Sequence, residues 1–144
     1  AMLLGSMLAG QAFANSPVAA VHALAYPIGG TFHIPHGLSN TLVLPNVLRF
    51  NAPVAYADYA EIAADAFPEL RVIEGRQARC AAFIDALEGL AKELGLPTRL
   101  RDVGIPKTSL EKMARDAMLQ TRLLVNNPRE IIEADALSIY NSAW

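Results

Sequence analysis

The first third of the sequence carries no charged side chain. Residues 1–48 contain no Asp, Glu, Lys or Arg, whereas residues 49–144 contain all 26 charged residues of the chain. Because a water-exposed surface of that length normally includes charges, we expect this segment to form core, a buried interface or the wall of a cleft. A membrane-spanning helix is not expected, since the longest nearly apolar stretch, Val18 to Tyr26, is too short to cross a bilayer.

The beginning of the chain has one feature of a secretory signal. An apolar start leads to Ala12-Phe13-Ala14, which has the small residues of a cleavage site. A signal peptide also needs a basic region before its apolar part, but the first Lys or Arg of this chain is Arg49. The single cysteine, Cys80, cannot form an intrachain disulfide and is predicted to be a small buried apolar residue. These features predict a cytoplasmic protein.

Length and composition fit one folded domain that covers residues 1–144. The chain has 53% hydrophobic residues, which is enough to bury a core. Its net charge is -2, and no cluster of Lys or Arg occurs along it. Nucleic acids and acidic membrane surfaces are therefore not expected as partners.

Helical patterns cover most of the charge-free segment. Helices are predicted over residues 2–14 and 17–26, the second starting after the N-cap candidate Asn15. Pro27 and the two glycines behind it are expected to end that helix, because proline removes a hydrogen-bond donor and glycine favours a turn. A loop of residues 27–36 is predicted to follow.

The charged part of the chain continues in helices. Apolar residues recur at helical spacing over residues 37–50, with a kink expected at Pro45 and a break at residues 51–53. Further helices are predicted over residues 56–67, 80–94, 109–119 and within 131–144. No alternating strand pattern appears, so the fold is predicted to be an all-α, multi-helix domain.

All three histidines of the chain lie in the charge-free segment, at positions 22, 33 and 36. His22 falls in a predicted helix, with Tyr26 one turn later on the same face. A corner between two helices would bring His22 and His36 together, and neutral imidazole is the commonest protein ligand for divalent transition metals. Ordinary histidines without a metal remain the alternative, because this spacing is not a specific motif and no carboxylate precedes Asp58.

The residues around the histidines carry a more specific pattern. It consists of Phe13, Asn15, His22, Pro27, Gly29, Pro35-His36-Gly37, Leu44-Pro45 and Asn51. It is extended near the end of the chain by Leu100-Arg101-Asp102-Val103-Gly104, Asn127-Pro128-Arg129 and Ala143-Trp144. In these motifs the chain resembles the iron-containing (group III) alcohol dehydrogenases over nearly its whole length.

The resemblance implies half of a two-domain enzyme. In that family an α/β domain holds NAD(P) and an all-helical C-terminal domain faces it across a cleft. This chain would be the helical domain without the nucleotide-binding domain, and it has no Gly-rich dinucleotide fingerprint. The implied divalent metal, iron or alternatively zinc, is held by an upstream Asp and His and by two downstream histidines that map onto His22 and His36. It acts as a Lewis acid on the oxygen of an alcohol or aldehyde substrate.

The same resemblance suggests roles for three more residues. Tyr26 stands where many relatives have a histidine near the nicotinamide and substrate, and a tyrosine donates or relays a proton less readily at neutral pH. His33 is expected near the metal without binding it, and both Phe13 and His33 are expected to line the substrate pocket. Plain packing is the alternative for Tyr26 and Phe13. No residue of this chain is identified as binding the nucleotide.

Two other functions remain open. The chain could be a non-catalytic helical module whose uncharged segment self-associates, giving a homo-oligomer, or docks a nucleotide-binding subunit. It could also be a stand-alone metal-binding protein that uses His22, His33 and His36 together. If instead the chain is the helical domain of an alcohol dehydrogenase, we expect it to bind metal weakly and to have no NAD-dependent activity alone.

Overall fold

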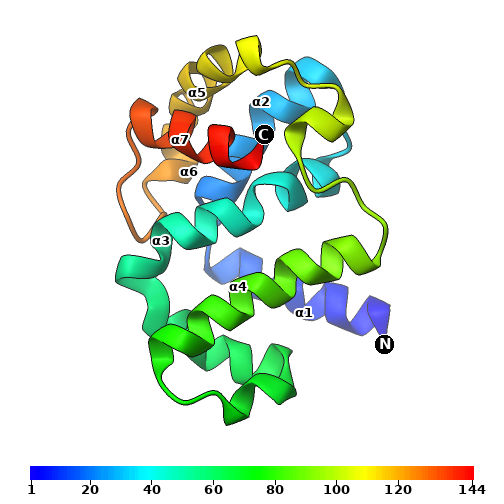
Figure 1. Ribbon diagram of the computed structural model, residues 1–144, viewed down its shortest axis with the longest axis vertical. Helices are drawn as coiled ribbons and strands as arrows, with labels where there is room; N and C mark the ends of the chain where they lie inside the picture. Colours follow the sequence, from blue (N-terminus) through cyan, green and yellow to red (C-terminus); the bar gives the residue numbers. More distant parts are fainter.

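The chain forms seven α-helices and three short 3₁₀ helices, described over residues 1–144 by a computed structural model (Figure 1). The α-helices are α1 (Met2–Asn15), α2 (Ala20–Phe32), α3 (His36–Ala66), α4 (Arg76–Glu93), α5 (Leu110–Met118), α6 (Thr121–Leu124) and α7 (Glu133–Ala143). The 3₁₀ helices are η1 (Pro68–Val72), η2 (Leu100–Val103) and η3 (Lys107–Ser109). There is no strand, which confirms the predicted all-α fold.

Helix α2 lies at the centre of the fold. Its buried side chains repeat at helical spacing and enter the core shared with α3 and α5: Ala20, Ala23, Leu24 and Ile28. Tyr140 of α7 is fully buried, and its hydroxyl donates a hydrogen bond to the carbonyl oxygen of Leu24 at 2.6 Å. Burial raises the pKa of Tyr140, so this hydroxyl stays protonated and remains a donor. Contacts on several sides therefore fix the position of α2.

The predicted limits of α2 are wrong at both ends. The helix begins at Ala20, and it continues through Pro27 to Phe32, so most of the predicted loop of residues 27–36 is helical. A proline inside a helix costs about 3 kcal/mol. Ile28 lies directly after Pro27 and is inaccessible to solvent, and burying its side chain stabilises by about 1.5–3 kcal/mol, which is comparable to that cost. Core packing thus overrides the local stop signal.

Helix α2 ends at Phe32, and His33 is its C-terminal capping residue. This residue adopts the left-handed conformation, with φ of 56° and ψ of 27°, and its N–H donates a hydrogen bond to the carbonyl of Gly29 at 3.0 Å. A left-handed residue directly after a helix closes the last turn and redirects the chain. Only residues 33–35 then separate α2 from α3, so the two helices form a tight corner.

Helix α3 is continuous where a break was predicted. It runs from His36 to Ala66 and contains both Pro45 and Pro53, so the predicted break at residues 51–53 is wrong. The ribbon of α3 nevertheless changes direction in its middle, where its colour passes from cyan to green (Figure 1). Prolines are a usual cause of such bends. Helix α3 packs against both α2 and α4.

The later helices agree with the sequence to within a few residues. The stripes predicted over residues 80–94 and 109–119 are α4 and α5, and α7 lies within residues 131–144. Cys80 is buried in α4, as predicted, and its burial raises the pKa of the thiol. None of the helices has the length and apolar content that a membrane span requires.

Two of the motif residues singled out in the sequence meet in the fold. The side-chain amides of Asn51 in α3 and Asn127, after α6, hydrogen-bond each other reciprocally at 2.9 and 2.8 Å. The guanidinium group of Arg129 donates to the carbonyl of Phe50 at 2.9 Å and lies 3.9 Å from the centre of the Phe50 ring. These contacts attach the segment before α7 to α3, so the Asn127-Pro128-Arg129 motif has a structural role here.

Candidate metal site

The candidate site lies at the corner between α2 and α3. His22 lies in the first turn of α2, and His36 is the first residue of α3. Ser39 is fully buried beneath the corner, and its hydroxyl lies 3.2 Å from the carbonyl oxygens of both Ile34 and Pro35. The connecting loop is therefore fixed onto α3, and the position of His36 relative to α2 is fixed with it.

The corner brings the two histidines together, as the sequence predicts. Their ring centroids lie 5.1 Å apart, with the ring planes tilted by 56°. Asn40, one turn after His36, lies between them: its Nδ2 is 3.4 Å from Nε2 of His22 and 3.3 Å from Nε2 of His36. A side-chain amide has two N–H donors, one for each ring. When Nδ2 donates to both rings, each Nε2 atom is the acceptor, and both Nε2 atoms lie within 3.4 Å of the same atom.

The electrostatic surroundings of His22 favour its neutral form. Burial, followed by the neighbouring His36, lowers the pKa of His22. Neutral imidazole is the form that binds a metal. The carbonyl oxygen of Asn40 is also buried and has no hydrogen-bond partner, which is an uncommon state for a native polar atom. The corner therefore combines two converging acceptors with an amide whose hydrogen bonds are incomplete.

Asn40 is the residue of this site that the sequence did not reveal. The signal available was its position, four residues after His36 and therefore on the same face of a helix. Its distance to His22 depends instead on how α2 and α3 cross, which no local pattern encodes. A polar residue one turn from a candidate ligand is a useful sign to follow in similar chains.

Tyr26 lies at the outer rim of the corner. It is one turn after His22 on α2, and its ring centroid is 6.3 Å from that of His36. Its side chain is 46% exposed, and it lines a shallow cavity of about 240 Å³ together with residues of the α5–α6 connection. The phenol is therefore near the histidines and open to a molecule that approaches them from solvent.

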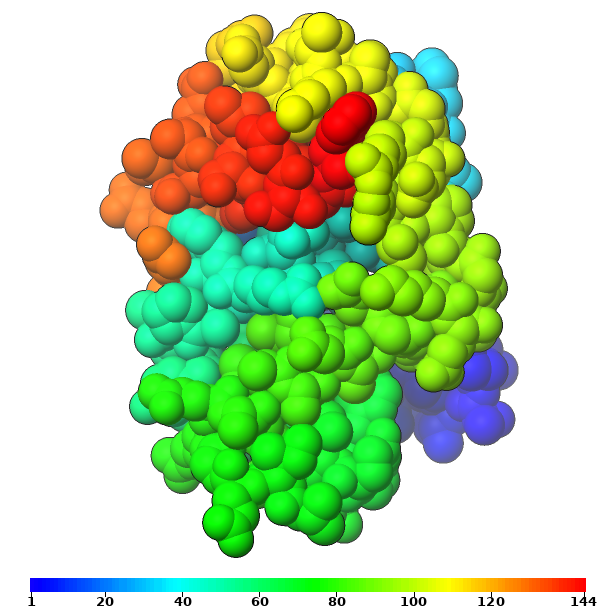
Figure 2. All heavy atoms as spheres, in the orientation of Figure 1, coloured from blue at the N-terminus to red at the C-terminus, as the bar shows by residue number.

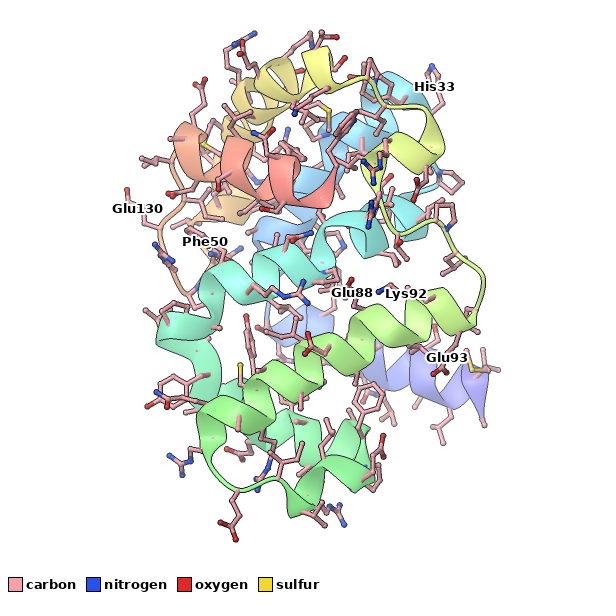
Figure 3. The ribbon with its side chains drawn as sticks, in the orientation of Figure 1. His33, Phe50, Glu88, Lys92, Glu93 and Glu130 are labelled. Atoms are coloured by element: carbon pink, nitrogen blue, oxygen red, sulfur yellow. The ribbon has the colours of Figure 1, made fainter.

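The other two residues assigned to the site do not join the cluster. His33 is exposed at the C-terminal end of α2, and Figure 3 shows its side chain directed outward. Phe13 lies on α1, where every residue is exposed, and it makes no aromatic contact with the histidines. The geometry thus unites His22, Tyr26 and His36 with Asn40 and leaves Phe13 and His33 apart.

The chain holds no complete metal site of its own. No group of three or more His, Cys, Asp or Glu side chains is positioned to bind an ion. A protein site for a transition metal normally has three or four protein ligands. A divalent metal bound at this corner would find two histidine side chains there, those of His22 and His36.

The chain is similar to known proteins over its full length. Residues 1–144 match the C-terminal part of the family described as Fe-containing alcohol dehydrogenase. The chain is 41% identical over 146 residues to long-chain-alcohol dehydrogenase 1 of Geobacillus thermodenitrificans (strain NG80-2), covering 99% of this chain and 36% of that protein. It is 35% identical over 143 residues to lactaldehyde reductase of Escherichia coli (strain K12), covering 99% of this chain and 37% of that protein.

A solved structure has the same fold. The crystal structure of a 1,3-propanediol oxidoreductase superposes with a TM-score of 0.89 at 32% sequence identity, over 96% of this chain and 36% of that one. This chain therefore spans little more than a third of the length of the relatives that it matches. The similarity confirms the resemblance seen in the sequence.

Proposed function

Because this chain belongs to the Fe-containing alcohol dehydrogenase family, whose C-terminal part it matches over residues 1–144, we propose that it supplies two metal ligands, His22 and His36, to an NAD(P)-linked alcohol dehydrogenase. The observation that carries the proposal is the position of one atom. Nδ2 of Asn40 lies within 3.4 Å of both Nε2 atoms, so the two imidazoles are aimed at a common point. Two converging neutral imidazoles are a suitable half-set of ligands for a divalent transition metal.

The donor set fits a metal of the kind that the family name implies. Imidazole nitrogen suits iron and zinc alike, so the residues present do not distinguish the two. A metal at this corner would act as a Lewis acid on the oxygen of the substrate. The unpaired carbonyl oxygen of Asn40 leaves this amide free to turn when the histidines take a new partner, since turning breaks no bond to that oxygen. The remaining ligands belong to residues outside this chain, where the family resemblance supplies an Asp and a His.

The proposed roles of the other residues follow from where they lie. Tyr26 is exposed and its ring lies near that of His36, and we assign its hydroxyl to hydrogen-bonding the substrate or passing a proton to solvent. Phe13 and His33 are exposed, and we assign them to the outer wall of a substrate pocket shared with the rest of the enzyme. NAD(P) is assigned mainly to residues beyond this chain, and the proposed substrates are alcohols and aldehydes, as the names of the relatives suggest.

Zinc titration of the isolated chain tests the ligand assignment. Wild-type chain, His22→Ala, His36→Ala and the matched control His33→Ala are titrated with Zn²⁺ by calorimetry at constant pH. With only two ligands, binding by the wild type is weak and measurable, and loss of either paired histidine weakens it by about tenfold or more. His33→Ala retains wild-type affinity. Equal losses in all three variants would show that histidines in general, and not this pair, bind the ion.

An activity assay tests the assignment to half of an enzyme. We expect no NAD(P)-dependent turnover of alcohols such as 1,3-propanediol by this chain alone. The family resemblance assigns the nucleotide site and two of the four metal ligands to residues outside it. Robust turnover by the pure chain would contradict this part of the proposal. Weak zinc binding without turnover is the combination expected.

A second candidate function is favoured by one observation on α1. Apolar side chains are exposed along this helix, with Met2 87% and Leu3 86% accessible, and no residue of it is buried. An apolar surface of this kind drives association unless something covers it. A helical module that self-associates, or that docks a nucleotide-binding subunit, would use this surface. A clean monomer in sedimentation at high concentration would exclude self-association.

A further inference from the structure

A polar cavity lies between α3, α4 and the C-terminal end of the chain. Its volume is about 300 Å³, and none of His22, Tyr26, His36 or Asn40 lines it. Figure 2 shows the surface hollowed where the red C-terminal helix, α4 in green and α3 in cyan meet. A cavity of this size is at the lower limit for small-molecule sites and accommodates only a small ligand.

Positive charge dominates the lining. The cavity is bordered by four cationic side chains and one carboxylate: Arg49, Lys92, Arg99, Arg101 and Glu88. The carboxylate is already engaged, because Arg49 lies 2.7 Å and Lys92 3.2 Å from the Glu88 oxygens. Hydrogen bonding to Arg49 lowers the pKa of Glu88 and keeps it ionised. It therefore offsets charge on one side of the cavity only.

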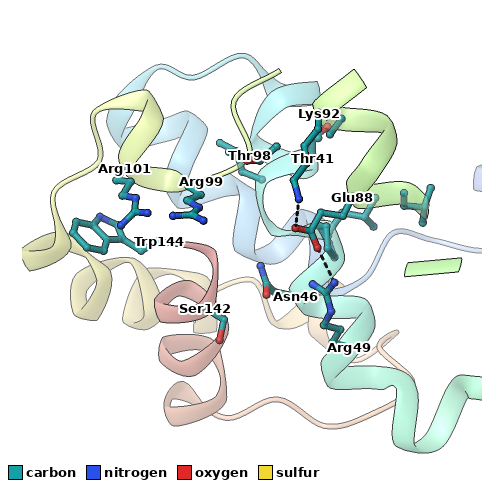
Figure 4. A pocket seen from close by; sticks show the side chains of 15 residues that line it. Thr41, Asn46, Arg49, Glu88, Lys92, Thr98, Arg99, Arg101, Ser142 and Trp144 are labelled. Atoms are coloured by element: carbon teal, nitrogen blue, oxygen red, sulfur yellow. Dashed lines mark hydrogen bonds and ion pairs between the residues drawn. The ribbon is translucent and has the colours of Figure 1, made fainter. Parts of the chain in front are cut away.

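The opposite side has two guanidinium groups without an anionic partner. Figure 4 shows Arg99 and Arg101 beside Trp144. Glu88 and its partners Arg49 and Lys92 lie across the cavity from them. Neither arginine forms an ion pair within the chain. The guanidinium carbon of Arg101 lies 5.6 Å from the centre of the Trp144 ring, which orients the group without neutralising it. Two like charges beside one small cavity favour occupation by an anion.

Neutral donors lie between these two sides. The side chains of Asn46 and Thr98 line the same cavity and make no hydrogen bond within the chain. Both side chains donate hydrogen bonds that a ligand oxygen accepts. Guanidinium groups bind carboxylate or phosphate through paired, parallel hydrogen bonds. Free cationic and neutral donors thus surround one space, and no acceptor of the chain uses them.

We propose that this cavity binds a small oxyanion with two negative charges, held by Arg99 and Arg101 and by the donors of Asn46 and Thr98. Two ligand sources share this chemistry, a phosphate group and a short dicarboxylate. The cavity is too small for a polymer, and the engaged Glu88 opposes deeper approach of an anion toward α4. The proposal is independent of the histidine corner, since no residue is common to the two sites.

The test is calorimetric titration of the chain with inorganic phosphate and, separately, with malonate, at ionic strength held constant by sodium chloride. Saturable binding of at least one of them is expected, and the stronger of the two identifies the source. Arg99→Gln is expected to weaken that binding by about tenfold. Arg115→Gln is the matched control, because Arg115 is exposed on α5, outside the cavity, and forms no ion pair.

Three possible results decide whether the cavity is an anion site. Loss in Arg99→Gln with retention in Arg115→Gln supports the site. Equal weakening by both variants would overturn it, because the effect would then be that of net charge. Absence of saturable binding of either anion by the wild type would also overturn it. Circular dichroism of each variant shows whether helicity is kept, and Thr98→Val provides a second, smaller change within the same cavity if Arg99→Gln fails to fold.

Discussion

Helices α1 and α2 come from the same charge-free segment and have opposite surroundings. Helix α2 is buried along one side, with Leu24 and Ile28 completely inaccessible, and it carries His22 at the candidate site. Helix α1 has no buried residue, and it is rich in the same apolar residue types. What differs is the availability of partners: α2 packs on α3 and α5, whereas α1 has no helix of this chain packed extensively against it.

The difference shows what apolar composition does and does not predict. It predicts correctly that α2 and the start of α3 form core, because their apolar residues recur on one face. For α1 the same composition predicts only that its apolar side chains would be more stable when another surface packs against them. The partner that covers it cannot be read from the segment itself.

Hydrogen exchange should give the largest contrast between the two helices. Backbone amides in the middle of α2 open only with the whole fold, whereas those of α1 need only local fraying. Protection in α2 should exceed that in α1 by about 1000-fold or more, if the domain has ordinary stability. The exchange is measured by mass spectrometry at low protein concentration. Equal protection of the two helices would contradict the view that α1 opens locally while α2 opens only with the whole fold.

Truncation of one leucine in each helix compares how much α1 and α2 contribute to the free energy of unfolding. Leu24→Ala should lower the free energy of unfolding by about 2–5 kcal/mol, because it leaves a cavity in the core. Leu8→Ala, the matched change on the exposed helix, should alter it by no more than about 0.5 kcal/mol. Denaturant unfolding of both variants measures the two values. A large loss in Leu8→Ala would mean that α1 is packed in solution.

A carboxylate at position 40 should strengthen metal binding at the candidate site on α2 and α3, whereas the same change on α1 should not. Asn40→Asp places a third ligand atom beside the Nε2 atoms of His22 and His36, so it should tighten Zn²⁺ binding by the isolated chain by about tenfold. Asn15→Asp adds the same charge on α1 and should leave the affinity unchanged. If Asn40→Asp binds no more tightly than the wild type, the two nitrogens do not converge on residue 40.

Loss of the hydrogen bond between Tyr140 of α7 and Leu24 of α2 should have a smaller effect on stability. Tyr140→Phe removes the hydroxyl that donates to the carbonyl of Leu24, and it should destabilise the fold by about 1 kcal/mol. Phe keeps the buried ring, so no large cavity forms. Thermal unfolding compares it with Tyr56→Phe, a change at a hydroxyl that forms no hydrogen bond within the chain. Equal melting temperatures for the two variants would show that the Tyr140 bond contributes nothing.

The sequence was sufficient for the all-α fold, because helical periodicity encodes it. It also indicated that a corner between two helices would bring His22 and His36 together, although it assigned a longer loop to that corner than the structure has. It was misleading at Pro27, where a local stop signal of about 3 kcal/mol is outweighed by burial in the core. It was silent on Asn40, whose place between the rings depends on how two helices cross. Local patterns encode elements, and contacts between elements depend on packing.

Diffraction from crystals of this chain soaked in Zn²⁺ would show whether His22 and His36 bind one metal ion together. Data collected on either side of the zinc absorption edge locate the ion without reference to any assumed ligand. We expect an anomalous peak at the α2–α3 corner, at about 2.0–2.1 Å from Nε2 of both His22 and His36, with the amide of Asn40 turned away. A peak on His33, or on only one of the paired histidines, would contradict it.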